Sequence, residues 1–143
     1  MKQREILFRG QDLITSEWKY GFFYQTEHSI SYIQSKKPGY PFEHGVVKEK
    51  TVTQYTGLKD INGKKIFEGD ICKISAEEPY PDVGFATDYD WSQIGSIKMI
   101  DCAWCVLAKS KDSIFLYDVI NRDIDINIKI LGNIFENHEL LEK

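Results

Sequence analysis

The sequence predicts an all-β protein with only a minor helical part. Aromatic residues make up 13% of the 143 residues, with eight Tyr and eight Phe, and these residue types favour strands. Isoleucines alternate with polar residues from Ile124 to Ile130, which is typical of a strand with one face in the core. Asn62-Gly63 lies between apolar residues and signals a two-residue type I′ hairpin, because Asn and Gly tolerate the positive φ that both turn positions require. We therefore expect strands joined by tight turns.

The composition is that of a globular protein that needs no metal or disulfide to fold. Hydrophobic residues account for 42% and charged residues for 28%, which excludes a largely disordered chain. A chain of this length fits one compact domain, or two small halves that share a core. Such a domain buries roughly two-thirds of its unfolded surface, and this is enough for stability without a cofactor.

The first 65 residues are expected to form a β region. Residues 6–9 have the pattern of a short strand, and residues 11–17 that of a loop or a single helical turn. Residues 18–25 place four aromatic side chains on one face by period-two alternation, which predicts a half-buried strand: Trp18, Tyr20, Phe22 and Tyr24. Residues 29–33 can pair back with this strand before two prolines and a glycine interrupt regular structure. Residues 46–55 then continue as extended chain toward the hairpin.

From Ile66 onward the pattern is that of about five short strands with tight turns, which is the amount of chain that a small SH3-like β-barrel needs. Gly69-Asp70 turns the chain into a core strand, and the strands are expected at residues 71–74, 95–101, 103–109, 114–120 and 124–130. Asn137 is expected to cap a last helical turn through Leu141. The sequence thus predicts a barrel at residues 66–143, with residues 1–65 packed on it or interlaced with it.

Three segments, in order along nearly the whole chain, carry a family resemblance. The central segment comprises Tyr55-Thr56-Gly57-Leu58-Lys59-Asp60, Asn62-Gly63-Lys64 and Ile66-Phe67-Glu68-Gly69-Asp70-Ile71. The opening and closing segments are Arg4-Glu5-Ile6-Leu7-Phe8-Arg9 and Leu131-Gly132-Asn133-Ile134-Phe135-Glu136-Asn137, the latter followed by Leu140-Leu141. Together they resemble the YopX family of small phage and prophage proteins. The resemblance implies a phage or prophage gene product with a β-rich fold, and it brings no established activity and no catalytic residues.

No motif in the sequence forms a catalytic constellation. Cys102-Ala103-Trp104-Cys105 lies in a strand context, where residues three apart face opposite sides of a sheet, so we expect structural cysteines rather than a redox or zinc site. The aspartates lack calcium-loop or nuclease spacing and are expected to be solvated surface charges: Asp82, Asp88, Asp90, Asp118, Asp123 and Asp125. The sequence has three histidines that stand apart from one another: His28, His44 and His138. No nucleophile elbow or phosphate loop occurs. We therefore expect no enzymatic activity and no cofactor.

Lys59, Lys64 and Lys65 are candidate nucleic-acid-binding residues. Lysines beside rings such as Tyr55 and Phe67 are the combination that holds single strands, because cations contact phosphates while rings stack on bases. The ordinary explanation is that lysines at a hairpin keep a sheet edge soluble. The formal net charge of −4 and the pI of about 5.4 also oppose nucleic-acid binding, so it is the alternative function.

The leading hypothesis is a non-enzymatic protein-interaction module. Residues 76–93 have the composition of a long acidic and aromatic loop, and long loops in compact domains are often functional. The loop contains four candidate partner-binding residues: Tyr80, Phe85, Tyr89 and Trp91. Aromatic residues of these types supply much of the binding energy of many protein interfaces, although in a long loop they equally pack against their own domain. The expected partner is an unidentified host or phage protein, with a homo-oligomer as a further expectation.

The sequence also predicts the compartment. It has no run of about 18 apolar residues and no apolar secretory segment at its N-terminus, so no membrane span is expected. Three cysteines, an odd number without an export signal, favour reduced thiols in the cytoplasm of a bacterial host.

Overall fold

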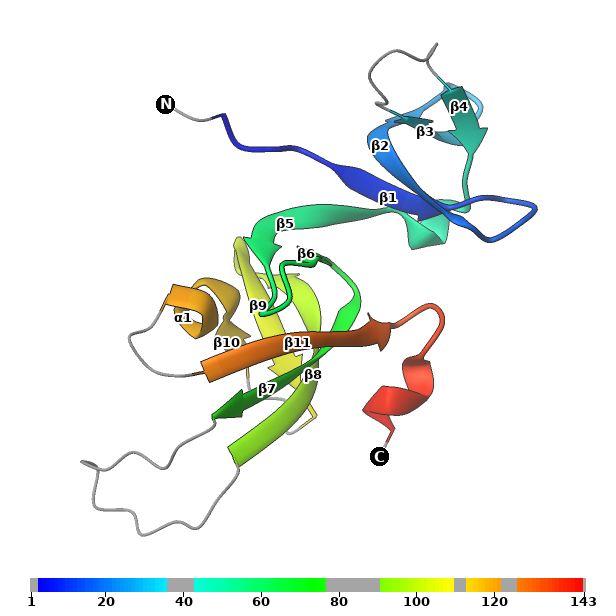
Figure 1. Ribbon diagram of the computed structural model, residues 1–143. Coiled ribbons are helices and arrows are strands. Elements are labelled where there is room, and N and C mark those ends of the chain that lie inside the picture. The colour runs from blue at the N-terminus through cyan, green and yellow to red at the C-terminus, as the bar shows by residue number, and fades with distance from the viewer. Residues whose placement is uncertain (1–2, 36–42, 77–90, 110–112, 122–125, 143) are drawn as a thin grey trace, which may run out of the picture. The chain divides into compact units, whose positions relative to one another are not determined.

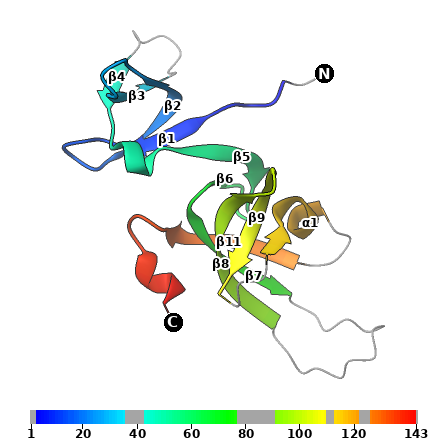
Figure 2. The same cartoon turned by 180° about the vertical axis from the view of Figure 1, so that it is seen from behind.

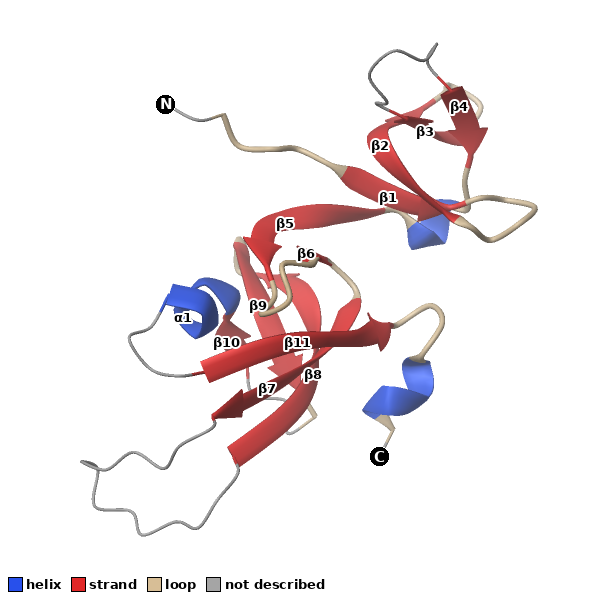
Figure 3. Ribbon diagram, in the orientation of Figure 1, coloured by secondary structure: helices blue, strands red, loops and turns tan. Residues whose placement is uncertain are grey.

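The protein is an all-β structure with two compact units. The computed structural model describes residues 3–35, 43–76, 91–109, 113–121 and 126–142 (Figure 1). Strands make up most of the described chain, and helical turns are few and short (Figure 3). The chain divides into Met1–Gly57 and Leu58–Lys143, and each unit is described by itself. The predicted all-β class is confirmed.

The first unit is an antiparallel sheet in the order β4-β3-β2-β1-β5. Its elements are β1 (Phe8–Gln11), β2 (Trp18–Gln25), β3 (Ser31–Ser35), β4 (Glu43–Val46), the 3₁₀ turn η1 (Glu49–Thr51) and β5 (Thr53–Lys59). β2 coincides with the strand predicted from alternation, whereas β1 begins two residues later than expected. β5 continues past Gly57 into the second unit.

One face of this first sheet is packed and the other is partly open. Phe23 of β2 lies opposite Ile33 of β3, which is buried, and the Phe23 ring lies 5.9 Å from the ring of Phe8. Val47 is also buried, and a Cβ atom on Gly10 would lie only 3.1 Å from it. These apolar contacts form the core of the first unit.

The predicted two-residue turn at Asn62-Gly63 is a longer turn in the structure. Of these two residues only Gly63 has positive φ. Its N–H donates to the carbonyl of Asp60, and the N–H of Asp60 donates to the carbonyl of Lys64. The Asp60 carboxylate accepts hydrogen bonds from the N–H groups of Asn62 and Lys64 at 2.9 and 2.8 Å. The prediction of a type I′ turn was wrong, because this carboxylate stabilises a three-residue loop with a single left-handed glycine.

The second unit contains a five-stranded antiparallel sheet in the order β10-β9-β8-β7-β11. After β6 (Lys65–Phe67), the strands are β7 (Asp70–Ala76), β8 (Trp91–Ile100), β9 (Ala103–Ala108), β10 (Ser113–Phe115) and β11 (Ile126–Asn133). Gly69, with a φ of +85°, precedes β7; its N–H donates to the carbonyl of Ile97, and its carbonyl accepts the N–H of Ile134. The sheet order gives no closed barrel, so an SH3-like barrel stays a prediction.

A short helix replaces the second half of one predicted strand. Residues 114–120 were expected to be extended, but the chain leaves β10 at Phe115 and forms α1 (Leu116–Asn121), which lies beside β9 and β10 (Figure 1 and Figure 2). Leu116 and Val119 are buried and Ile120 is half-buried, a spacing that matches one face of a helix. They complete a core with Ile66, Cys72, Ile74, Ile97, Val106, Ile128 and Ile130.

The C-terminal segment is held by asparagine side chains. Oδ1 of Asn133 accepts hydrogen bonds from the N–H groups of Phe135 and Glu136, each at 3.0 Å. Asn137 precedes the 3₁₀ turn η2 (His138–Leu141), but its side chain does not cap that turn. Its Oδ1 instead accepts the N–H of Asn133 at 3.2 Å. The predicted capping role of Asn137 was therefore wrong.

Two further features concern the expected organisation. β7 ends at Ala76 and β8 begins at Trp91, so the loop expected at residues 76–93 is shortened at its end by a strand. The packing or interlacing of residues 1–65 on the second half stays a prediction.

Among the described residues, no helix is long and apolar enough to cross a membrane.

Candidate interaction surface

Four aromatic side chains gather on the open face of the first sheet, and we call this set the aromatic face: Tyr20, Phe22, Tyr24 and Tyr32. On β2, Tyr20 is 46% exposed, Phe22 is 45% exposed and Tyr24 is 38% exposed. Tyr32 of β3 lies directly opposite Tyr24, and the two rings stack with centroids 5.1 Å apart and planes 9° apart. The strand predicted to be half-buried thus presents a row of rings to solvent.

The aromatic face follows from the local pattern of β2 and the register of its neighbours. Alternate residues of a strand face opposite sides, so the rings at 20, 22 and 24 share one side while Phe23 packs into the core. The residues opposite these rings are Arg9, Gln34 and Tyr32. Arg9, the only charged one among these three, is 4% exposed. The face is therefore aromatic, with Gln34 as a polar neighbour and without an accessible charge at those three positions.

Arg9 is held at the side of this face by contacts that include Trp18 and Thr53. Its guanidinium lies 4.5 Å from the centroid of the Trp18 ring, and its Nε donates to Oγ1 of Thr53 at 3.2 Å. A cation over an indole face is attracted by the ring quadrupole, and the attraction is stronger when the cation is desolvated. Arg9 therefore anchors Trp18 and joins β1 to β5, rather than offering its charge to a ligand.

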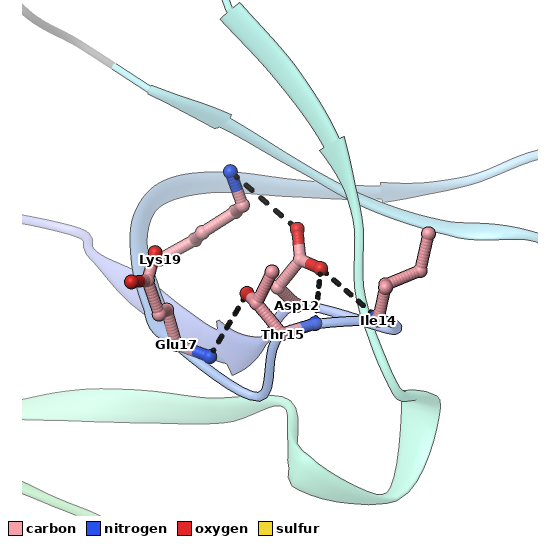
Figure 4. Close-up of polar contacts among 5 residues, drawn as sticks. All are labelled: Asp12, Ile14, Thr15, Glu17 and Lys19. Carbon is pink, nitrogen blue, oxygen red and sulfur yellow. Dashed lines mark hydrogen bonds and ion pairs between the residues drawn. The ribbon is translucent and has the colours of Figure 1, made fainter.

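The turn that leads into β2 is organised by Asp12 (Figure 4). Its Oδ1 accepts the N–H groups of Ile14 and Thr15 at 2.9 and 3.0 Å, and its Oδ2 lies 3.6 Å from Nζ of Lys19 (Figure 4). Hydrogen bonds from the backbone of Thr15 and Ile14, and then the charge of Lys19, lower the pKa of Asp12. Oγ1 of Thr15 accepts the N–H of Glu17, which brings the chain to Trp18 (Figure 4). These bonds set where β2 begins.

The lysines proposed for nucleic-acid binding lie at the hairpin of the second unit. Lys59 and Lys64 are exposed, and Lys65 is half-buried at the start of β6. The rings expected beside them are not accessible, because Tyr55 is 6% exposed and Phe67 is 3% exposed. The predicted combination of lysines with stacking rings was therefore wrong, and the lysines alone remain.

The other residues proposed for partner binding come from the loop expected at residues 76–93. Tyr80, Phe85 and Tyr89 lie outside the described residues. The backbone of Trp91 begins β8 and pairs with Ala76. Their proposed role in partner binding stays a prediction.

The cysteines have different environments. Cys72 and Cys105 are buried, whereas Cys102 is exposed in the turn between β8 and β9. Burial raises the pKa of Cys72 to about 12, and burial followed by the charge of Asp101 raises the pKa of Cys105. Both buried thiols are thus neutral side chains at physiological pH, as expected of structural cysteines.

Other candidate chemistry is dispersed or outside the described residues. His28 is exposed in a turn, and Nδ1 of His138 lies 3.3 Å from Oε1 of Glu142, while His44 belongs to β4. Within the described part of the chain, no three His, Cys, Asp or Glu side chains are grouped to hold a metal ion. Of the aspartates considered from the sequence, Asp118 belongs to α1. The others lie outside the described residues: Asp82, Asp88, Asp90, Asp123 and Asp125.

Sequence reasoning missed two exposed lysines that register brings together. Lys73 of β7 and Lys129 of β11 are directly opposite each other. Each lies between buried core residues, so alternation alone indicates that both point outward. Their pairing depends on the register of two strands far apart in the sequence, which no local pattern gives.

Comparison with known proteins finds a family match over nearly the whole chain. A family model described as YopX protein matches residues 7–142. The fold is also similar to that in the crystal structure of protein EF1440 from Enterococcus faecalis, with a TM-score of 0.53 and 24% sequence identity over 97% of this chain and 99% of that chain. At this identity the likeness shows the fold alone. No curated protein matches the chain.

Proposed function

Since the chain belongs to the YopX family, and since its first unit exposes an aromatic face, we propose that it is a non-enzymatic protein-interaction module of a phage or prophage. The observation that carries the proposal is the row of three exposed rings on β2. Aromatic residues are enriched in interfaces and supply a large part of their binding energy, whereas accessible charges are depleted at interface centres. The aromatic face has both properties.

The size of the aromatic face fits the centre of an interface. A fully buried aromatic residue removes about 150–250 Å² from water, so the exposed fractions on β2 offer roughly 250 Å². A standard interface buries about 800 Å² on each partner, with an apolar centre surrounded by a polar rim. The rings thus supply the anchor of such an interface, and the surrounding sheet supplies the rim.

The polar residues of the family-like segments support a non-enzymatic role. The carboxylate of Asp60 accepts backbone N–H groups in the hairpin, and that of Asp70 accepts the N–H of Phe67 at 2.8 Å. The amide oxygens of Asn133 and Asn137 also accept backbone N–H groups. Side chains used in this way position the chain, and a catalytic acid, base or nucleophile has to be accessible to a substrate.

The test replaces two rings by a β-favouring residue and measures partner capture. Tyr20→Thr/Phe22→Thr removes two anchors while keeping strand propensity. We expect the variant to capture the partner from bacterial host lysate, treated with nuclease, at least roughly 30-fold less strongly, since a hot spot contributes about 2 kcal/mol or more. Quantitative mass spectrometry reads the captured proteins, and sedimentation of the pure chain reads self-association.

The matched control is Phe115→Thr/Tyr117→Ala, which removes two exposed rings from the second unit. It is expected to capture as the unmodified chain does. Equal capture by both double variants and the unmodified chain, with folding intact, would exclude the aromatic face as the interface.

A further inference from the structure

Two lysines of the second unit face each other across a strand pair. Lys73 of β7 and Lys129 of β11 are directly opposite in the antiparallel register, and both are exposed. Within the described residues, no carboxylate forms an ion pair with either ammonium group. Like charges in directly opposite positions destabilise a sheet. An anionic ligand would remove this repulsion.

The hairpin between β5 and β6 brings further lysines to the same edge. The N–H of Ile61 donates to the carbonyl of Ile128 at 3.0 Å, and the N–H of Ile130 donates to Oδ2 of Asp60 at 3.1 Å. These bonds attach the hairpin to β11 on both sides of Lys129. The hairpin carries Lys59 and Lys64, which are exposed. We call Lys59, Lys64, Lys73 and Lys129 the lysine surface.

The chemistry of the lysine surface selects the kind of ligand. The carboxylate of Asp60, in the same hairpin, is 7% exposed and accepts three backbone N–H groups, so it is turned away from any ligand. The rings of Tyr55 and Phe67 are buried and cannot stack on bases. Four ammonium groups spread over a hairpin and two strands suit an extended ligand with repeated negative charges, rather than one small anion.

We propose that the lysine surface binds the phosphate backbone of a nucleic acid without reading its bases. This site is distinct from the aromatic face and does not depend on the proposed protein partner. The formal charge of the whole chain is −4, but the Asp60 carboxylate beside the lysine surface is buried and occupied by backbone hydrogen bonds. Affinity therefore comes from lysine–phosphate contacts and the counterions that they release.

The experiment measures binding of the full chain to fluorescent 20-base-pair DNA duplexes of two unrelated sequences at several salt concentrations. Four phosphate contacts give a slope of about −3.6 in log affinity against log salt, so affinity falls roughly 150-fold between 50 and 200 mM salt. Lys73→Gln/Lys129→Gln is expected to reduce the slope by about two. Its thermal midpoint is expected to be unchanged or higher, because the like-charge pair is gone.

The matched control is Lys50→Gln/Lys98→Gln, which changes the net charge equally through exposed lysines of η1 and β8. It is expected to bind as the unmodified chain does. An equal loss of binding in both double variants would overturn the site, because total charge would then explain it. Binding to neither duplex nor single-stranded DNA or RNA at 20 mM salt would overturn the proposal, and so would binding only to anionic vesicles or to an acidic peptide.

Discussion

Asp60→Ala is expected to destabilise the second unit by about 2–6 kcal/mol. The carboxylate is 7% exposed and accepts the N–H groups of Asn62, Lys64 and Ile130. Ile130 is buried, so its N–H is left without an acceptor at a cost of about 1–3 kcal/mol. The two turn N–H groups lose about 0.5–1.5 kcal/mol each, since water replaces their bond more easily there. The sum is a large part of the roughly 5–15 kcal/mol of a typical domain.

Asp60→Asn separates the two roles of this side chain. The amide oxygen still accepts the two turn N–H groups, but the amide nitrogen places a donor against the N–H of Ile130. We therefore expect a smaller loss than in Asp60→Ala, about 1–3 kcal/mol, located at β11. Urea unfolding followed by fluorescence measures the free energy of unfolding, and amide hydrogen exchange of Ile130 and Ile61 shows where protection is lost.

A loss of less than about 1 kcal/mol in Asp60→Ala, or exchange of the Ile130 amide as slow as in the unmodified chain, would contradict this expectation. Such a result would mean that the carboxylate does not connect the hairpin to β11. The lysine surface would then lose the contact that attaches Lys59 and Lys64 beside Lys129.

Three further predictions concern single side chains. At pH 8 a thiol reagent should label Cys102 quickly and Cys72 only on unfolding, because Cys102 is exposed while Cys72 is buried with a pKa of about 12; fast labelling of Cys72 in the folded chain would contradict this. The pKa of Asp12 is lowered from its ordinary value of 3.8, so its ionised carboxylate stabilises the fold. This contribution is complete when the pH is above the ordinary pKa, and it is lost as the pH falls through the lower folded pKa. Acid unfolding of Asp12→Asn should lack that component, and identical acid-unfolding curves for the variant and the unmodified chain would exclude it. Gln93→Met should raise the free energy of unfolding by about 1 kcal/mol, since within the described chain Oε1 of Gln93 is buried without a hydrogen-bond partner, and a destabilised variant in urea titration would show that the oxygen has one.

The strands that depend on a local pattern were predictable from the sequence. β2 coincides with the alternating aromatic run, and Ile128 and Ile130 are buried as the alternation of β11 predicted. Alternation does not say which face a neighbouring element covers. The sequence therefore predicted a half-buried strand with its rings on one face, and the structure packs the other side, where Phe23 lies opposite Ile33.

Features that depend on tertiary context were not predictable in the same way. The run from Ile114 to Ile120 is rich in apolar residues that favour strands, yet the packing of Leu116 and Val119 selects a helical spacing for α1. The turn at Asn62-Gly63 was misjudged because Asp60 supplies a side-chain acceptor just before it. Likewise, the lysine surface requires the register of β7 with β11, and this register contains an irregularity between Ile130 and Gly132.

Hydroxyl-radical footprinting of the captured complex is the most direct test of the proposed interaction surface. The labelling of each ring is compared between the free chain and the chain bound to its partner, with Tyr117 as an exposed reference in the second unit. We expect Tyr20, Phe22 and Tyr24 to become protected while the labelling of Tyr117 is unchanged. Unchanged labelling of those three rings, with protection elsewhere, would contradict it.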